Sequence, residues 1–428
     1  MSALLRGGRY NPGVDVEASL AAIAERNAEL NAFVGFVPGV VDEARDDDGP
    51  LAGMPIAIKD MFVDRDRVPT CGSGSTPAWL TGTATVIERL RRAGAAIVGY
   101  TNLHEWGLGT TSTVSAFGPV RNPRDPARIA GGSSGGSGAA LAAGLVDGAT
   151  GTDAGGSIRV PAACCGIVGF KPTWGRVPLA GFADGTDGPP IDHTGPMARS
   201  VAVVATLFEV MADTKVEQVD VSSLRVGVLR RQFLDTSASE VREAVEGCIE
   251  ILGPDISSIK DVDLEGAEIP GQVLPMLLLA HTAGLVRDDL ENSPEAFQPE
   301  TLNLLTLGSQ ISEENLRQSN TARVALRDAW DRLFEEVDVV LTPTIPTLPA
   351  RVDELTVELP TGSTSVELAQ VSHNSPMNLG GVPALSLPCG ETGDWTVNVT
   401  ITAARDHDDH ALALGHVVEE RLGLVPRH

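Results

Sequence analysis

Glycine is concentrated in one stretch of this chain strongly enough to restrict how the backbone can fold. Residues 131–157 hold ten glycines in 27 positions, where the chain average of 46 in 428 would give about three. Within the stretch, the small residues of 136–146 (GSGAALAAGLV) are typical of a closely packed helix, and the flanking glycines permit tight turns. The composition is too mixed for a low-complexity linker.

The remainder of the chain alternates between patterns typical of helices and of buried strands. Residues 83–93 (TATVIERLRRA) predict a helix that ends before Gly94, and the strand pattern AAIVGY follows directly. Such alternation is typical of an α/β fold. Further helices are expected at 14–32 and at about 407–422, and further strands at 55–60, 338–346, 384–390 and 395–404.

Residues 213–333 depart from this alternation because they are more acidic and predict helices. Strand patterns return after them, so we interpret the segment as a helical excursion or cap, inserted into a core that both ends of the chain build. The expected organisation is one large domain over 1–428, with 51–208 and 338–428 supplying the core.

The overall charge and the cysteines exclude several classes of protein. A net charge of −25 argues against duplex nucleic acid or an anionic membrane as the main partner. No apolar run is long enough to span a membrane, and MSALLRGGRYNPG at the start lacks the apolar core of a signal peptide. Five cysteines without a CxxC pair favour reduced thiols in the cytoplasm. No Cys/His cluster has the spacing of metal ligands, so no metal is expected.

Lysine is rare, which makes each lysine informative. Only four of the 32 basic residues are Lys, and we attribute this scarcity to a coding bias towards Arg. Lysine differs from arginine because it can lose its proton when buried. Lys59 follows the apolar strand pattern PIAI, where burial would favour the neutral amine and make it usable as a base. The competing interpretation is an ion pair with Asp60 or another carboxylate.

Two glycine-rich segments place serines where they could take part in chemistry. GGSSGGSG at 131–138 lacks the lysine of a phosphate-binding loop, and its serines either transfer protons or cap the following helix. In GTDAGGSIRVPAACCG at 151–166, Ser157 follows two glycines whose N–H groups could converge on an oxyanion. The alternative for this second segment is a tight glycine turn.

A nucleophilic serine needs a base, and histidine is the usual one. None of the eight histidines lies in a G-x-S-x-G or H-E-x-x-H pattern. We interpret His407 and His410 as solvated surface residues, and His104 and His193 as packing or hydrogen-bonding residues. Lysine is therefore the better candidate base.

Together, PIAIKD, GGSSGGS and TDAGGSIRVPA resemble the motifs of the amidase signature family, the Ser–Ser–Lys amidohydrolases. They occur in the family's order, with 74 residues from Lys59 to Ser133 and 24 from Ser133 to Ser157. Supporting segments are GYTNLHEWGLG at 99–109 and SPMNLGGVPALSLP at 375–388. The resemblance implies an α/β domain with a central mixed β-sheet flanked by helices, and a helical cap that varies between members.

The resemblance also implies roles for individual residues. Ser157 would be the acyl-forming nucleophile, Ser133 the bridging serine beside a cis peptide bond, and Lys59 the base. The N–H groups of the nucleophile loop would form the oxyanion hole, and three further residues would support the site. The oxyanion-hole residues are Ala154, Gly155 and Gly156 with Ser157 itself, and the supporting residues are Ser134, Asp153 and Arg159. The family commonly has Thr where Ala154 stands, but only the backbone N–H is needed there, so activity is expected to survive.

The implied function is hydrolysis of a small carboxamide to an acid and ammonia or an amine, without cofactor or metal. The alternative is the glutaminase-type subunit of a tRNA-dependent amidotransferase, for which 428 residues is short. A non-catalytic scaffold is disfavoured because Lys59, Ser133 and Ser157 are all present. The expected partner is a small amide, with no nucleic acid and no membrane, and a homodimer is left open. The apolar run at 273–286 either lines the acyl pocket or packs in the core, and the cleft itself is expected to be nearly uncharged.

Overall fold

The structure is a computed structural model, and it describes residues 15–37, 39–40, 49–65, 67–183 and 189–423. The expectation of no signal peptide falls on the first residues of the chain, which lie outside this described part. Within the described part, no helix combines the length and the apolar character that crossing a membrane requires. All five cysteines are buried and none forms a disulfide, as expected.

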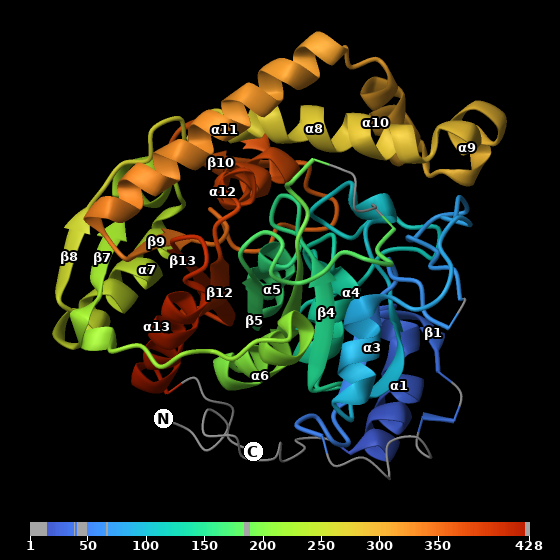
Figure 1. Cartoon of the computed structure of the whole chain (residues 1–428), viewed down its shortest axis with the longest axis horizontal. Coiled ribbons are helices and arrows are strands. Elements are labelled where there is room, and N and C mark those ends of the chain that lie inside the picture. The colour runs from blue at the N-terminus through green and yellow to red at the C-terminus, as the bar shows by residue number, and fades with distance from the viewer. Residues whose placement is uncertain (1–14, 38, 41–48, 66, 184–188, 424–428) are drawn as a thin grey trace.

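A mixed β-sheet of 11 strands runs through the described residues, in the order β1-β3-β2-β4-β6-β5-β12-β13-β9-β7-β8 (Figure 1). Strand β2 pairs in parallel with β3 and β4, and β7 pairs in parallel with β8 and β9, whereas the other pairings are antiparallel. A small hairpin of β10 and β11 lies apart. The strands are β1 (Phe33–Phe36), β2 (Pro55–Lys59), β3 (Ala96–Thr101), β4 (Gly148–Thr152), β5 (Val168–Lys171), β6 (Thr194–Ala198), β7 (Arg225–Val228), β8 (Ser258–Asp261), β9 (Val339–Pro343), β10 (Thr356–Leu359), β11 (Gly362–Ser365), β12 (Ala384–Thr392) and β13 (Trp395–Ala403).

Helices cover both faces of this sheet. Those that the structure describes are α1 (Val16–Leu30), α3 (Thr85–Arg92), α4 (Gly135–Ala142), α5 (Arg159–Cys165), α6 (Val201–Ala212), α7 (Ser239–Leu252), α8 (Pro270–Leu285), α9 (Arg287–Asn292), α10 (Pro299–Ser309), α11 (Glu313–Glu336), α12 (Val366–Gly380) and α13 (Asp408–Arg421). Figure 1 shows α8, α10 and α11 extended along the upper edge of the molecule, beyond the sheet. The architecture is the expected single α/β domain with a central mixed sheet flanked by helices.

The expected helical excursion over 213–333 needs a correction. Two short strands, β7 and β8, lie within it and join the far end of the main sheet. Helix α7 packs against β9, β12 and β13, so it belongs to the layer that covers the sheet. Only the later part of the segment, from α8 to α11, forms a separate layer of helices, which packs on α12.

The alternation of side chains along β2 decides which residues meet the glycine-rich segment. Ile56 and Ile58 pack into the large core cluster with α3 and α6, whereas Ala57 faces the small residues of α4. Because successive side chains of a strand point to opposite faces, Lys59 lies on the same face as Ala57. The side chain of Lys59 therefore lies on the face of the sheet that α4 covers.

Helix α4 approaches the sheet closely because its first turn has no side chain in the way. A Cβ atom on Gly136 would lie 2.3 Å from the backbone oxygen of Asn102 and 2.5 Å from that of Ala32. The N–H of Gly136 also donates to the Asn102 oxygen at 3.1 Å. Glycine at position 136 therefore lets α4 pack directly against the backbone of Asn102 and Ala32.

We expect Gly136→Ala to lower the free energy of unfolding by about 2–3 kcal/mol, because the new methyl group overlaps backbone oxygens that cannot rotate away. Gly247→Ala is the matched control, since Gly247 lies within α7 and a methyl group added there would meet no atom within 4 Å. That control should raise the free energy by about 0.5–1 kcal/mol, as alanine does in a helix interior. Urea titration of the two variants measures both changes, and equal stability of the two would contradict the packing described.

Candidate active site

Lys59 is fully buried at the end of β2, and its amine lies between two hydroxyl groups. Its Nζ is 2.7 Å from Ser133 Oγ and 2.6 Å from Thr152 Oγ1. The neighbouring carboxylate, Asp60, instead accepts hydrogen bonds from Arg67 at 2.5 Å and from the hydroxyl of Thr70 at 2.5 Å. The carboxylate of Asp60 is thus held by Arg67 and Thr70, whereas the amine of Lys59 faces Ser133 and Thr152.

The other three lysines differ from Lys59 in their partners. Lys215 and Lys260 pair with glutamates on the surface, whereas Lys171 is fully buried and donates to the backbone oxygen of Val382 at 2.5 Å. Burial, followed by the positive charge of Arg159, lowers the pKa of Lys171 well below its usual value. Of the four lysines, Lys59 and Lys171 are the two that the core encloses.

Ser133 is held in a tightly packed turn before α4. The peptide bond between Gly132 and Ser133 is cis. The backbone oxygen of Ser133 accepts from His104 N at 3.1 Å and from Ser112 Oγ at 3.2 Å. These contacts hold the backbone of Ser133, while its hydroxyl faces Lys59.

Ser134 has a different role from the two that the sequence suggested. It stands at the N-cap position of α4, but its side chain makes no capping hydrogen bond. Its hydroxyl instead donates to the backbone oxygen of Thr152 and accepts from the Thr152 N–H, both at 3.3 Å. Ser134 therefore positions Thr152, whose hydroxyl contacts Lys59.

The loop that carries Ser157 is closed by a buried ion pair. Asp153 and Arg159 have fully buried side chains, and Asp153 Oδ1 lies 2.9 Å from an Arg159 nitrogen. Burial alone would raise the pKa of Asp153, but the charge and hydrogen bonds of Arg159 hold it below its usual value. The carboxylate also accepts from Gly156 N at 2.7 Å and from Ile158 N at 3.2 Å, so it fixes the turn on both sides of Ser157.

This turn changes the expected set of oxyanion donors. The N–H of Gly156 is directed at Asp153, so it does not point into the space beside Ser157. Gly156 has a φ of +122°, and a Cβ there would lie 2.8 Å from Asn374, which explains the glycine. Ala154, Gly155 and Ser157 remain as candidates from the expected set.

Helix α12 holds the same ion pair from the other side. Arg159 donates to the backbone oxygen of Asn374 at 3.1 Å and to Asn378 Oδ1 at 2.6 Å. Asn378 Nδ2 in turn donates to the Asp153 backbone oxygen at 2.7 Å and to its Oδ1 at 2.8 Å. The SPMNLGG segment of the sequence indicated no role for Asn378, because its partner lies far away in the chain.

His104 and His193 are buried and poorly suited to act as bases. Burial, with a smaller contribution from the charge of Lys59, lowers the pKa of His104 to about 3. Burial and then the charge of Lys171 lower the pKa of His193 well below its usual value. His193 Nδ1 lies 2.7 Å from the backbone oxygen of Ile191. These contacts fit the expected packing and hydrogen-bonding roles.

A pocket of about 220 Å³ opens beside Ser157, with Ala154 and Gly155 also in its wall. Helix α8 contributes four apolar side chains, so the apolar run at 273–286 lines this pocket as well as packing in the core. They are Leu274, Pro275, Leu278 and Leu279. The expectation of a nearly uncharged cleft is wrong at two positions, because Glu300 and Glu367 also line the pocket.

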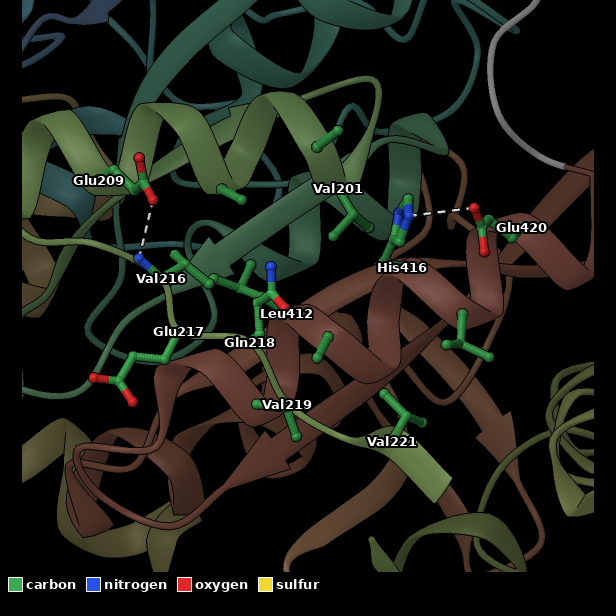
Figure 2. A pocket seen from close by; sticks show the side chains of 14 residues that line it. Val201, Glu209, Val216, Glu217, Gln218, Val219, Val221, Leu412, His416 and Glu420 are labelled. Carbon is green, nitrogen blue, oxygen red and sulfur yellow. Dashed lines mark hydrogen bonds and ion pairs between the residues drawn. The ribbon is translucent and has the colours of Figure 1, made fainter. Parts of the chain in front are cut away.

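A second cavity, of about 260 Å³, lies between α6, α13 and the segment 216–221 (Figure 2). Its walls are largely valine, alanine and leucine, and His416 faces Glu420 at 3.3 Å within it. It shares no residue with the pocket beside Ser157. None of the residues that the motifs singled out lies in its wall.

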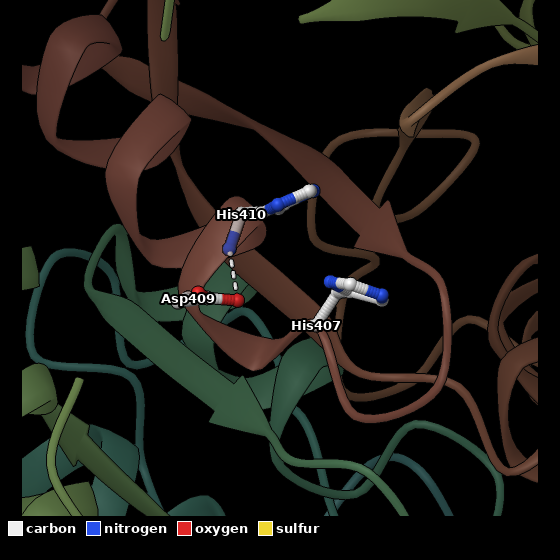
Figure 3. A group of neighbouring side chains, drawn as sticks. All are labelled: His407, Asp409 and His410. Carbon is white, nitrogen blue, oxygen red and sulfur yellow. Dashed lines mark hydrogen bonds between the residues drawn. The ribbon is translucent and has the colours of Figure 1, made fainter. Parts of the chain in front are cut away.

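One group among the described residues has donor atoms spaced for a metal ion. His407, Asp409 and His410 bring their ligand atoms within 4.8 Å of one another at the start of α13 (Figure 3). Asp409 Oδ1 also accepts from the N–H of His410 at 3.0 Å. The positive end of the α13 dipole disfavours a cation there. The two histidines lie partly or fully at the surface, as expected, and none of the three belongs to the site around Lys59.

Comparison with known proteins gives a consistent result. The family model described as Amidase matches residues 15–412. In Methanospirillum hungatei, the A subunit of the glutamyl-tRNA(Gln) amidotransferase is 32% identical, over 91% of this chain and 97% of that protein.

Solved structures agree with this result. One described as the crystal structure of an amidase is 32% identical, with a TM-score of 0.87 and 98% of each chain covered. Another, from a vestigial protein complex connected with the origins of an s-triazine catabolic enzyme, is 30% identical, with a TM-score of 0.86 over 95% of this chain and 94% of that one. With these matches spanning nearly the whole chain, the protein belongs to the amidase signature family.

Proposed function

We propose that this chain is a serine amidase that hydrolyses a small carboxamide to an acid and ammonia or an amine. The observation that carries the proposal is the buried 2.7 Å contact between Lys59 Nζ and Ser133 Oγ, on the face where α4 and the Ser157 loop meet. A lysine enclosed in this way, with its amine in contact with two hydroxyl groups, is suited to act as a neutral base.

The proposed reaction moves one proton along three side chains. Ser157 Oγ attacks the amide carbon and passes its proton to Ser133 Oγ, whose own proton goes to Lys59 Nζ. The resulting ammonium donates to Ser133 and Thr152, the two hydroxyls already within 2.7 Å. The relay then reverses to protonate the leaving nitrogen. Water cleaves the acyl-enzyme by the same route.

The negative charge that develops on the carbonyl oxygen during attack requires hydrogen-bond donors beside Ser157. We propose that the backbone N–H groups of Ala154, Gly155 and Ser157 stabilise this oxyanion, while Gly156 serves the turn through Asp153. Since only backbone groups act here, Ala154 is as suitable as the more usual threonine. Asp153 and Arg159 would then be positioning residues, which shape the loop without touching the substrate.

The second candidate is the glutaminase-type subunit of a tRNA-dependent amidotransferase. The names of the curated relatives support it more directly than they support a free-standing amidase. Two observations favour the first candidate. No Lys, Arg or His is among the described residues that line the pocket, so none of them supplies a positive charge for the α-carboxylate of glutamine. The alignment with the Methanospirillum protein runs over 439 positions, more than this chain has, so that relative contains segments absent here.

Ammonia release by the purified chain distinguishes the two candidates. We expect the chain alone to hydrolyse short apolar amides faster than glutamine. Glutamine hydrolysis as the dominant activity, or activity that appears only when a partner subunit is added, would favour the second candidate instead.

Replacing Ser157 with Ala removes the proposed nucleophile. We expect Ser157→Ala to lower kcat by about 10⁴- to 10⁶-fold, because the acyl-enzyme can no longer form. Circular dichroism and thermal unfolding should match those of the wild type, since the side chain faces the pocket. Near-normal turnover by a folded Ser157→Ala protein would refute the assignment.

Replacing Lys59 tests the base. Lys59→Arg keeps the positive charge but cannot supply a neutral amine, so kcat/KM should fall by about 10²- to 10⁴-fold between pH 6 and 8. Lys260→Arg is the matched control, because Lys260 is exposed and pairs with Glu336 on the surface. Lys59→Met also lacks the amine but is closer in size to lysine. A loss of activity in this variant as well would show that the missing base is the cause, and not crowding by the larger arginine. Wild-type rates in either Lys59 variant would rule out the proposed role.

A further inference from the structure

The pocket beside Ser157 combines apolar walls with charge of a single sign. Its apolar surface comes mainly from α8, together with Leu304 of α10 and Val371 of α12. The charged side chains among its described lining residues are Glu300 and Glu367, and both are acidic. At about 220 Å³ the pocket is smaller than the ~300–1,000 Å³ typical for drug-sized ligands, so it suits a short chain.

Glu367 is a fixed part of the wall. Its Oε2 accepts from Thr110 N at 2.7 Å and from Thr110 Oγ1 at 2.6 Å, which ties α12 to the loop at 107–110. The pKa of Glu367 lies above its usual value, chiefly because of burial; the hydrogen bonds from Thr110 oppose this rise, and the negative charge of Glu300 adds to it. Glu300 is exposed and lines the same pocket as Glu367. The two carboxylates therefore act on the same region of the pocket.

A purely structural explanation covers only part of this arrangement. Glu300 lies in the first turn of α10 and Glu367 in the first turn of α12, where helix dipoles favour acidic residues. That preference explains why an acid is tolerated at each position. It does not account for two helices that direct their acidic ends into one apolar pocket, with no basic group among its described lining residues.

We infer that the pocket selects amides whose short apolar chain ends in an ammonium group, and that Glu300 and Glu367 determine this preference. The inference rests on the proposed amidase function, since it places the substrate carbonyl at Ser157 and the chain along α8. An ammonium would lie between the two carboxylates and relieve their mutual repulsion. A carboxylate at the same end of the chain would be repelled.

Three amides of similar length test this charge preference: pentanamide, 5-aminopentanamide and glutaramic acid. Dissociation constants are measured by calorimetry on the Ser157→Ala protein, so that binding is observed whether or not turnover occurs. We expect 5-aminopentanamide to bind about tenfold more tightly than pentanamide, and glutaramic acid about tenfold more weakly. Added salt should reduce both ratios, because Glu300 is exposed to solvent.

Variants then assign the preference to the two residues. Glu300→Gln and Glu367→Gln are each added to the Ser157→Ala protein, and Gln at 367 can still accept both bonds from Thr110. We expect each to lower the ratio between 5-aminopentanamide and pentanamide, and the pair to bring it close to one. Glu335→Gln, on the exposed side of α11, removes the same charge outside the pocket and should leave the ratio unchanged. If Glu367→Gln does not fold, the Glu300→Gln variant still tests the preference, because Glu300 is exposed.

Failure of this inference differs from failure of the proposed function. Equal binding of the three amides, tighter binding of glutaramic acid, or no binding of any would overturn the charge preference. Hydrolysis of the same amides by the wild-type chain tests the amidase proposal separately. Turnover of pentanamide without a preference for 5-aminopentanamide would leave the amidase proposal standing and remove the preference.

Discussion

The close approach of α4 to the sheet is the constraint on which the site depends. Lys59 reaches Ser133 only because the turn before α4 lies against the strand ends, where Gly136 meets the backbone of its neighbours directly. Small residues on the facing side of the sheet make room for the same contact. At Gly136, close packing of backbone against backbone thus replaces a contact between side chains. The glycine content of the segment follows from that geometry.

The ion pair between Asp153 and Arg159 is the second element that organises the site. Burying two charges is costly unless they are paired and fully hydrogen-bonded. Here the carboxylate receives two backbone N–H groups besides Arg159, and the guanidinium reaches two residues of α12. The pair therefore fixes the shape of a loop that has almost no side chains of its own to pack. Asp153 thus fixes the turn on both sides of Ser157, and Arg159 holds Asp153 in place.

Local patterns along the chain predicted the elements that have strong signals. The helices near both ends and the apolar strands β2, β3, β9, β12 and β13 were all expected within a few residues of their observed bounds. The strands β7 and β8 were not, because each has only four residues and β8 is an edge strand with exposed polar positions. A short strand at the edge of a sheet has no apolar run by which the sequence could reveal it.

The candidate site, like the fold, could be predicted only in part from the sequence. Lys59, Ser133 and Ser157 lie in recognisable motifs, so they could be proposed from the sequence. The partners of those residues could not, because contacts such as Asn378 with Asp153 or Glu367 with Thr110 join segments more than 200 residues apart. The engagement of the Gly156 N–H was equally hidden, since it depends on the exact course of a turn. Motifs thus point to the proposed reacting groups, while the surrounding charges emerge only from the fold.

The distance along the chain between the Ser157 loop and α12 has a consequence for biosynthesis. Arg159 is held by Asn378, which is 219 residues further on, and the segment from α6 to α11 must be synthesised before α12 leaves the ribosome. Until then the loop lacks the contacts that hold its ion pair. A nascent or truncated chain that ends before α12 therefore contains all three motifs but lacks the contacts that α12 makes with the Ser157 loop.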